Sequence, residues 1–139
     1  MKKVVIGVDM GGTKISVKLI DARARVLASA TLPTLKDLEA HESVRTLRET
    51  VASMVTGRAG HRARLAGIGI GLPGPVDSKK GRVPWSPNMQ GWEGIPLRSI
   101  LEKAFKVPVI LDNDCNAAGF GEKCFGVGFE LGQDHGRYF

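Results

Sequence analysis

The sequence predicts an α/β domain in which a three-stranded antiparallel meander is extended by parallel strands with crossover helices. Short runs of β-branched residues separated by tight turns fill residues 4–32, a pattern typical of a meander. Residues 35–56 then carry apolar side chains at helical spacing. After that helix, short apolar strands alternate with a second helical segment, which is typical of parallel strands joined by crossovers.

Three strands are expected before residue 33. Residues 4–8 form a short β-branched run, and residues 15–20 alternate apolar with polar side chains. Residues 25–32 place Val26, Ala28, Ala30 and Leu32 on one face. Because the turns between these segments are short, neighbouring strands are predicted to run antiparallel.

The remaining helices and strands are predicted from the spacing of apolar residues and from glycine and proline residues that end them. The long helix is predicted from Leu35 to Thr56 and ends at Gly57, and residues 65–72 form the next strand. Residues 78–94 are irregular, and loops of this length are often functional. A short helix over 96–105, a buried strand over 107–111 and a helix from Asn113 to about residue 125 complete the order.

The composition fits one globular unit. A chain of 139 residues with 42% hydrophobic content is long enough for a single core. No stretch reaches the roughly 18 apolar residues of a membrane span, and the start does not read as a signal peptide, so we expect a cytoplasmic protein without membrane contact. The two cysteines lack zinc-ligand spacing, so no zinc site is expected.

The net charge is +6, and the positively charged residues cluster in residues 45–64 and around Lys79 and Lys80. Such a pattern attracts nucleic acid in some proteins. However, no aromatic residues are interleaved with these cations and no helix-turn-helix is readable. A solvated basic face is therefore favoured over a nucleic-acid interface.

Residues 9–14 read DMGGTK, and they do not match the two familiar phosphate motifs. The order Gly-Thr-Lys and the missing first glycine exclude a P-loop. Residues 69–74 match GxGxxG, but Pro73 and Pro75 obstruct the helix that a dinucleotide site requires. The segment is instead predicted to be a hairpin turn whose glycines permit positive φ.

The chemistry of this turn suits a triphosphate. Two glycines expose backbone N–H groups, Thr13 offers a hydroxyl group, and Lys14 offers a cation. The Asp9 carboxylate suits hydrated Mg²⁺. A plain hairpin without a ligand remains the alternative.

Four motifs occur in an order that resembles the N-terminal half of the ROK family (repressors, open reading frames, kinases) over residues 2–128. They are DMGGTK (9–14), GIGIGLPGPVD (67–77), PNMQGW (87–92), and NDCNAA (113–118) followed by Gly121-Glu122. The resemblance implies an actin-like, ribonuclease-H-like ATPase lobe. It also implies an ATP-dependent kinase that phosphorylates a hexose or an N-acetylhexosamine with Mg²⁺, as glucokinases do.

The resemblance also implies roles for individual residues. The phosphate-binding turn would contain Asp9, Gly11, Gly12, Thr13 and Lys14, with Asp9 acting on Mg²⁺ indirectly. The catalytic base would be Asp114, and the sugar would be held by Gly74, Asn88, Asn113 and Asp114. Asparagine and aspartate suit this task because they donate and accept hydrogen bonds with hydroxyl groups. A simple helix cap remains the alternative reading of Asn113 and Asp114.

Residues 1–128 are thus interpreted as the N-terminal lobe, and residues 129–139 as an atypical, truncated or frame-shifted tail. The C-terminal lobe that completes the ATP site of such kinases is expected to be absent, so turnover by this chain alone is not expected. Homodimers are a further implication of the resemblance. The alternative function is a sugar-binding remnant or a fragment of a sugar-sensing regulator, without its DNA-binding module because only eight residues precede Asp9.

Overall fold

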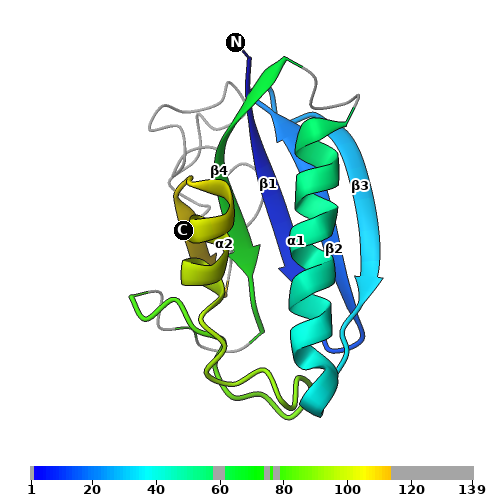
Figure 1. The fold of residues 1–139 in the computed structure, drawn as a ribbon, viewed down its shortest axis with the longest axis vertical. Helices are drawn as coiled ribbons and strands as arrows, with labels where there is room; N and C mark the ends of the chain where they lie inside the picture. Colours follow the sequence, from blue (N-terminus) through cyan, green and yellow to red (C-terminus); the bar gives the residue numbers. More distant parts are fainter. Residues whose placement is uncertain (1, 58–61, 74–75, 77–78, 114–139) are drawn as a thin grey trace.

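A computed structural model describes residues 2–57, 62–73, 76 and 79–113. Its centre is a five-stranded sheet with the order β3-β2-β1-β4-β5 (Figure 1). The strands are β1 (Lys2–Met10), β2 (Lys14–Asp21), β3 (Val26–Pro33), β4 (Ala63–Gly71) and β5 (Val109–Asp112). Antiparallel pairing joins β1 to β2 and β2 to β3, whereas β4 runs parallel to both β1 and β5. The predicted α/β arrangement is confirmed, and the expected helix and tail beyond residue 113 lie outside the described residues.

Two helices cover one face of this sheet (Figure 1). The first, α1 (Ala40–Thr56), crosses from β3 to β4, and the second, α2 (Leu97–Phe105), connects β4 to β5. Pro96 stands at the N-cap of α2, where its missing N–H group costs nothing. Between β4 and α2, residues 79–94 contain no helix or strand, as the sequence predicts.

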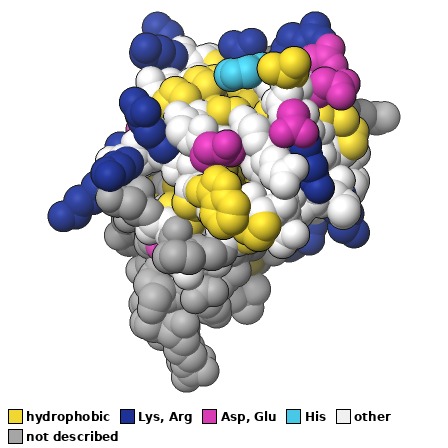
Figure 2. All heavy atoms as spheres, turned by 90° about the horizontal axis from the view of Figure 1, so that it is seen from below, with side chains coloured by type: hydrophobic (Ala, Val, Ile, Leu, Met, Phe, Trp, Pro, Cys, Tyr) yellow, Lys and Arg dark blue, Asp and Glu magenta, His cyan; other side chains and the backbone are white. Residues whose placement is uncertain are grey.

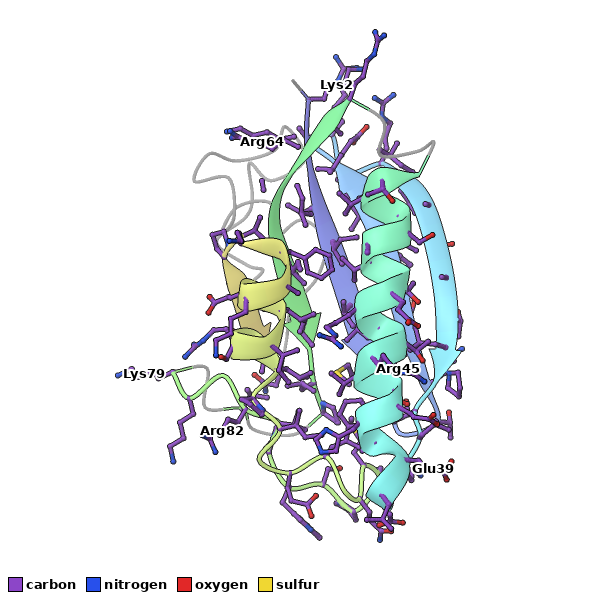
Figure 3. All side chains as sticks on the ribbon, in the orientation of Figure 1. Lys2, Glu39, Arg45, Arg64, Lys79 and Arg82 are labelled. Carbon is purple, nitrogen blue, oxygen red and sulfur yellow. The ribbon has the colours of Figure 1, made fainter. Side chains whose placement is uncertain are left out.

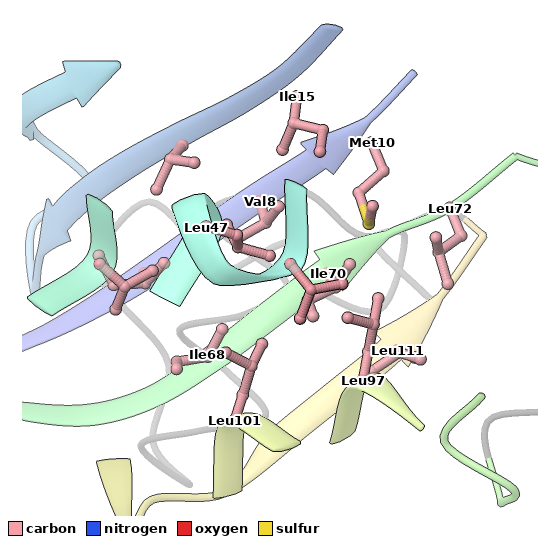
Figure 4. Close-up of a cluster of buried hydrophobic side chains, with 14 of the residues drawn as sticks. Val8, Met10, Ile15, Leu47, Ile68, Ile70, Leu72, Leu97, Leu101 and Leu111 are labelled. Atoms are coloured by element: carbon pink, nitrogen blue, oxygen red, sulfur yellow. The ribbon is translucent and has the colours of Figure 1, made fainter. Parts of the chain in front are cut away.

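The core lies between the sheet and the two helices (Figure 4). Alternate residues of each strand face it, including Val8 and Ile70, which are at most 2% exposed. Leu47 of α1 and Leu101 of α2 pack onto them from the helix side and are fully buried. The apolar residues at period 2 in the strands and at helical spacing in the helices therefore pack into one hydrophobic layer. This packing fixes the positions of the strand ends relative to each other.

The long helix begins later than predicted. Asp37–Glu39 form a short 3₁₀ helix, η1, and the α-helix starts only at Ala40. Leu35 and Leu38 match the helical spacing, yet Leu35 lies in an extended segment and Leu38 is 97% exposed. The Leu35 N–H donates to Ser43 Oγ at 2.8 Å, and Asp37 has a left-handed φ of 55°. These tertiary bonds and the left-handed residue exclude a regular helix here.

Asp21 organises the turn between β2 and β3. Its Oδ1 accepts hydrogen bonds from the Arg23 and Arg25 N–H groups, each at 2.9 Å, and its Oδ2 pairs with Arg25 Nε at 2.8 Å. Burial alone would raise the pKa of this carboxyl group, but the donors at Arg25 and Arg23 outweigh burial and lower its pKa. The ionised carboxylate therefore stabilises the turn.

Asp21→Asn is expected to lower the free energy of unfolding at pH 7 by about 1–2 kcal/mol, because charge-assisted hydrogen bonds are lost. The folded pKa is below the unfolded value, so this stabilisation is complete above about pH 4 and disappears as the pH falls through the folded pKa. Urea unfolding at pH 7 and pH 3 measures the difference. Glu42→Gln, which breaks an exposed ion pair with Arg45, is the control with almost no expected cost. A cost for Asp21→Asn that does not change with pH would contradict this account.

The positive charges do not form one surface. Arg45 lies on the lower part of α1, whereas Arg64 and Lys2 lie at the opposite end of the sheet, and Lys79 and Arg82 project from the loop after β4 (Figure 3). Dispersed charge of this kind is typical of a solvated surface rather than of a continuous nucleic-acid interface. Neither helix in the described part of the chain is both long and apolar enough to cross a membrane.

Candidate functional site

The carboxyl ends of three parallel strands meet at one edge of the sheet. Asp9 of β1 is opposite Gly71 of β4, and Gly71 is opposite Asp112 of β5. The Leu72 N–H then donates to the Asp112 carbonyl at 3.0 Å, which holds the two strand ends together. Ligands of open α/β sheets bind outside this edge, so the loops that leave it are the candidate ligand-binding segments.

The β1–β2 turn is a tight hairpin at this edge. The Gly11 N–H donates to the Lys14 carbonyl at 2.9 Å, which leaves Gly12 and Thr13 at the tip. Within the described residues, the N–H groups of Gly12 and Thr13 donate to no protein acceptor. Thr13 and Lys14 are exposed. The predicted cluster of backbone donors, a hydroxyl group and a cation is therefore present in one turn.

The reason for glycine in this turn differs from the prediction. Neither Gly11 nor Gly12 has positive φ, so the expected left-handed turn is wrong. Instead, a Cβ atom on Gly12 would lie 2.9 Å from Asn88 Cβ and 3.1 Å from the Asn88 carbonyl oxygen. Glycine is needed because Asn88 packs directly on the turn. The predicted phosphate and sugar contacts are thus brought together, although 76 positions separate them in the chain.

Asn88 lies in the loop of residues 86–94. We call this segment the acceptor loop, because Asn88 is a predicted contact of the sugar that would accept the phosphoryl group. Short internal bonds shape it: Asn88 N–H donates to Ser86 Oγ at 3.2 Å, and Trp92 N–H donates to the Met89 carbonyl at 3.2 Å. Trp92 is fully buried, and its indole N–H donates to the Leu35 carbonyl at 2.6 Å. Trp92 therefore anchors this loop to the segment that follows β3.

Trp92→Phe is expected to destabilise the chain by about 1–3 kcal/mol, because the half-buried Leu35 carbonyl loses its donor and a smaller ring fills the site of the buried Trp92. Equilibrium urea unfolding measures the loss. Phe105→Leu, a change at a half-buried side chain of α2, serves as the packing control and is expected to cost less. Equal stability of Trp92→Phe and the unchanged chain would refute the anchoring role.

Of the other predicted sugar contacts, the structure describes only Asn113. It is exposed immediately after β5, and its N–H donates to Asp112 Oδ1 at 2.7 Å. Gly74 and Asp114 lie outside the described residues. Sequence reasoning missed Asp112, a half-buried carboxylate at the end of β5. Its position at a strand end was the available signal, since parallel strands present their carboxyl ends at one edge.

The Asp9 carboxylate fits an indirect role toward a cation. It is exposed at the end of β1, and it makes no ion pair within the described residues. In that same part of the chain, no three His, Cys, Asp or Glu side chains gather as a direct metal site. A single exposed carboxylate suits Mg²⁺ that keeps its waters and is held mainly by phosphate.

The end of the molecule below the sheet in Figure 1 has a mixed surface. Lysine and arginine side chains lie around its edge, with acidic and hydrophobic side chains between them (Figure 2).

A separate groove of about 500 Å³ lies between β3 and α1, and none of the candidate site residues lines it. The candidate site residues therefore lie at the strand ends and not in this groove.

A model of the ROK family matches residues 5–131, nearly the whole chain. The chain belongs to the ROK family. A glucokinase from Thermotoga maritima is 37% identical over 131 residues, which cover 94% of this chain and 39% of that enzyme. A xylose repressor from Caldicellulosiruptor bescii is 34% identical over 124 residues, which cover 88% of this chain and 30% of the repressor. The chain thus spans well under half the length of these relatives.

Solved ROK structures share the fold. A ROK hexokinase from Thermus thermophilus superposes with a TM-score of 0.68 at 38% identity, covering 88% of this chain and 38% of that one. A ROK glucokinase from Streptomyces griseus, in complex with glucose and AMPPNP, gives a TM-score of 0.61 at 34% identity, covering 89% and 37%. The ROK chain described here therefore has the actin-like ATPase fold that its sequence predicts.

Proposed function

We propose that this ROK chain supplies the phosphate-binding turn and the sugar-binding residues of an ATP-dependent kinase that acts on a hexose or an N-acetylhexosamine. One observation carries the proposal: Asn88 packs against Gly12 so closely that a Cβ atom there would lie 2.9 Å from Asn88 Cβ. Phosphoryl transfer needs donor phosphate and acceptor hydroxyl in direct proximity. The turn meets that need, because its Gly12 and Thr13 N–H groups donate to no acceptor in the described part of the chain and lie beside the exposed Asn88 amide.

The chemistry of each residue suits one of three roles: phosphate binding, sugar binding or proton acceptance. Backbone N–H groups of Gly12 and Thr13, with Lys14, would bind phosphate oxygens, where charge accumulates during transfer. Asn88, Asn113 and Gly74 would border the sugar. Asp114 would accept the proton of the attacking hydroxyl group as the oxygen–phosphorus bond forms.

Mg²⁺, when bound to the nucleotide, would neutralise phosphate charge during transfer. Asp9 would hold it through coordinated water, because magnesium retains several waters in nucleotide sites. The nucleotide base and the remaining phosphate contacts require a second lobe, since the chain spans only 39% of the glucokinase from Thermotoga maritima. We propose that turnover depends on that lobe, that residues 1–128 are the first lobe, and that homodimers form through regions beyond them.

A hexose panel tests the kinase function. The full polypeptide in which this sequence occurs is mixed with Mg-ATP and glucose, mannose, fructose, N-acetylglucosamine or N-acetylmannosamine, and ADP release is followed. We expect sugar-dependent ADP release with at least one of them and formation of a sugar phosphate by mass spectrometry. ATP consumption that is independent of every sugar would refute the kinase proposal.

The similarity to xylose repressors favours a second candidate, a sugar sensor without phosphoryl transfer. In that case the sugar contacts would serve binding alone. Calorimetry distinguishes the two: hexose affinity that is unchanged by Mg-ATP, with no sugar phosphate formed, favours the sensor. Hexose affinity that changes when nucleotide occupies the turn favours the kinase, because the two sites touch at Gly12 and Asn88.

A further inference from the structure

One residue outside every predicted motif forms hydrogen bonds to the β1–β2 turn, residues 11–14, which we call the phosphate turn. Thr34 follows β3, is 7% exposed, and contacts the turn twice. Its Oγ1 donates to the Gly11 carbonyl at 2.8 Å, and its N–H donates to the Thr13 carbonyl at 3.0 Å. The two carbonyl groups that flank the tip are therefore both bound by the same residue.

The first of these bonds sets the direction of a donor. In a trans peptide the carbonyl of one residue and the N–H of the next point in opposite directions, and no described peptide is cis. Because Thr34 Oγ1 holds the Gly11 carbonyl, the Gly12 N–H points away from Thr34. This N–H donates to no acceptor among the described residues, and an unpaired backbone donor of this kind suits an anion.

The residues that follow Thr34 hold the acceptor loop. The Leu35 carbonyl accepts the Trp92 indole N–H at 2.6 Å, and the Asp37 N–H donates to the Gln90 carbonyl at 2.7 Å. The segment of residues 34–37 thus bonds the turn through Thr34 and the acceptor loop through Leu35 and Asp37. These bonds hold the turn and the acceptor loop in a fixed relation to each other.

We propose that Thr34 is a positioning residue: its hydroxyl orients the Gly11–Gly12 peptide so that the Gly12 N–H binds the phosphate chain of the nucleotide. The inference rests on the proposed function, because it assigns a phosphate to the turn. Thr34 itself contacts the turn backbone and transfers no proton. Its loss should weaken phosphate binding while leaving hexose binding intact.

Matched variants of the full polypeptide test this role. Thr34→Val keeps the shape and the N–H but removes the hydroxyl donor, and Thr34→Ser restores it. Thr50→Val is the control, since Thr50 Oγ1 donates to the Thr46 carbonyl at the same 2.8 Å but on α1. Dissociation constants for tripolyphosphate and Mg-ATP are measured by calorimetry, KM values for ATP and hexose by ADP release, and Tm by calorimetric scanning.

Thr34→Val is expected to weaken tripolyphosphate and Mg-ATP binding about 3- to 10-fold, the worth of one aligned hydrogen bond, with the hexose KM within about twofold. Thr34→Ser should bind nearly as the unchanged protein does, and Thr50→Val should leave phosphate affinity unchanged. Unchanged affinity in Thr34→Val, failure of serine to restore it, or an equal rise of both KM values would overturn the proposal. So would an unchanged protein that binds neither phosphate compound at millimolar concentration.

The same measurements separate this inference from the proposed function. If the unchanged protein binds Mg-ATP but phosphorylates no sugar, the kinase proposal fails, whereas Thr34 is still judged by the dissociation constants. If sugar phosphorylation is intact and Thr34→Val binds phosphate normally, the kinase proposal stands and the positioning role of Thr34 is wrong.

Discussion

Asp114→Asn is expected to lower kcat for hexose phosphorylation about 10³-fold in the full polypeptide, the typical contribution of a positioned general base. Asparagine retains the size and hydrogen-bonding capacity of aspartate but accepts no proton from the sugar hydroxyl. The KM for ATP should change less than about twofold, because the substitution removes a proton acceptor for the sugar hydroxyl and leaves the contacts of the phosphate turn unchanged. Steady-state ADP release at saturating ATP measures both values.

Asp112→Asn is the matched control for this prediction. Asp112 is a carboxylate at the end of β5, two positions before Asp114 in the sequence, and its Oδ1 accepts the Asn113 N–H at 2.7 Å. Asparagine keeps that acceptor, so kcat should fall less than about tenfold. If Asp112→Asn abolishes turnover while Asp114→Asn retains it, the base is Asp112 and the assignment of Asp114 is wrong.

The sheet was predictable because its signals are local. Alternating β-branched residues before residue 33 mark β1 to β3, and the short turns between them imply the antiparallel pairing that is observed. The start of α1 was not predictable, because Leu35 and Leu38 continue the helical spacing. Their backbone is diverted by Ser43, Gln90 and Trp92, and bonds across as many as 57 positions leave no trace in local periodicity.

The close contact between the turn and Asn88 was not predictable from the sequence. The family resemblance implied that residues 9–14 and Asn88 bind different parts of the substrates, whereas the glycines were explained by turn conformation. The structure instead explains Gly12 by the approach of Asn88. Thr34 was missed because a lone threonine after a strand has no distinctive signature, and its role depends on which carbonyl its hydroxyl reaches.

Gly12→Ala is expected to lower kcat/KM for the hexose on the order of 10²-fold, because small displacements of reacting groups have effects of that size. The added methyl group would meet Asn88 Cβ at 2.9 Å and the Asn88 carbonyl at 3.1 Å. Neither atom is the end of a flexible side chain, so the acceptor loop must move away from the turn. The free energy of unfolding should fall by only about 1 kcal/mol, since both loops are at the surface.

A double-mutant cycle with Asn88→Gly identifies the cause of this loss. Asn88→Gly lowers kcat/KM by itself, because it removes a proposed sugar contact, but it also removes the Cβ atom that alanine at position 12 would meet. Gly12→Ala should therefore cost much less in the Asn88→Gly background than in the unchanged protein, and the two effects should be clearly non-additive. Additive losses would mean that glycine at position 12 serves the phosphate alone. A coupled loss would mean that the turn and the acceptor loop act as one unit, since the close approach of Asn88 is then what restricts position 12 to glycine.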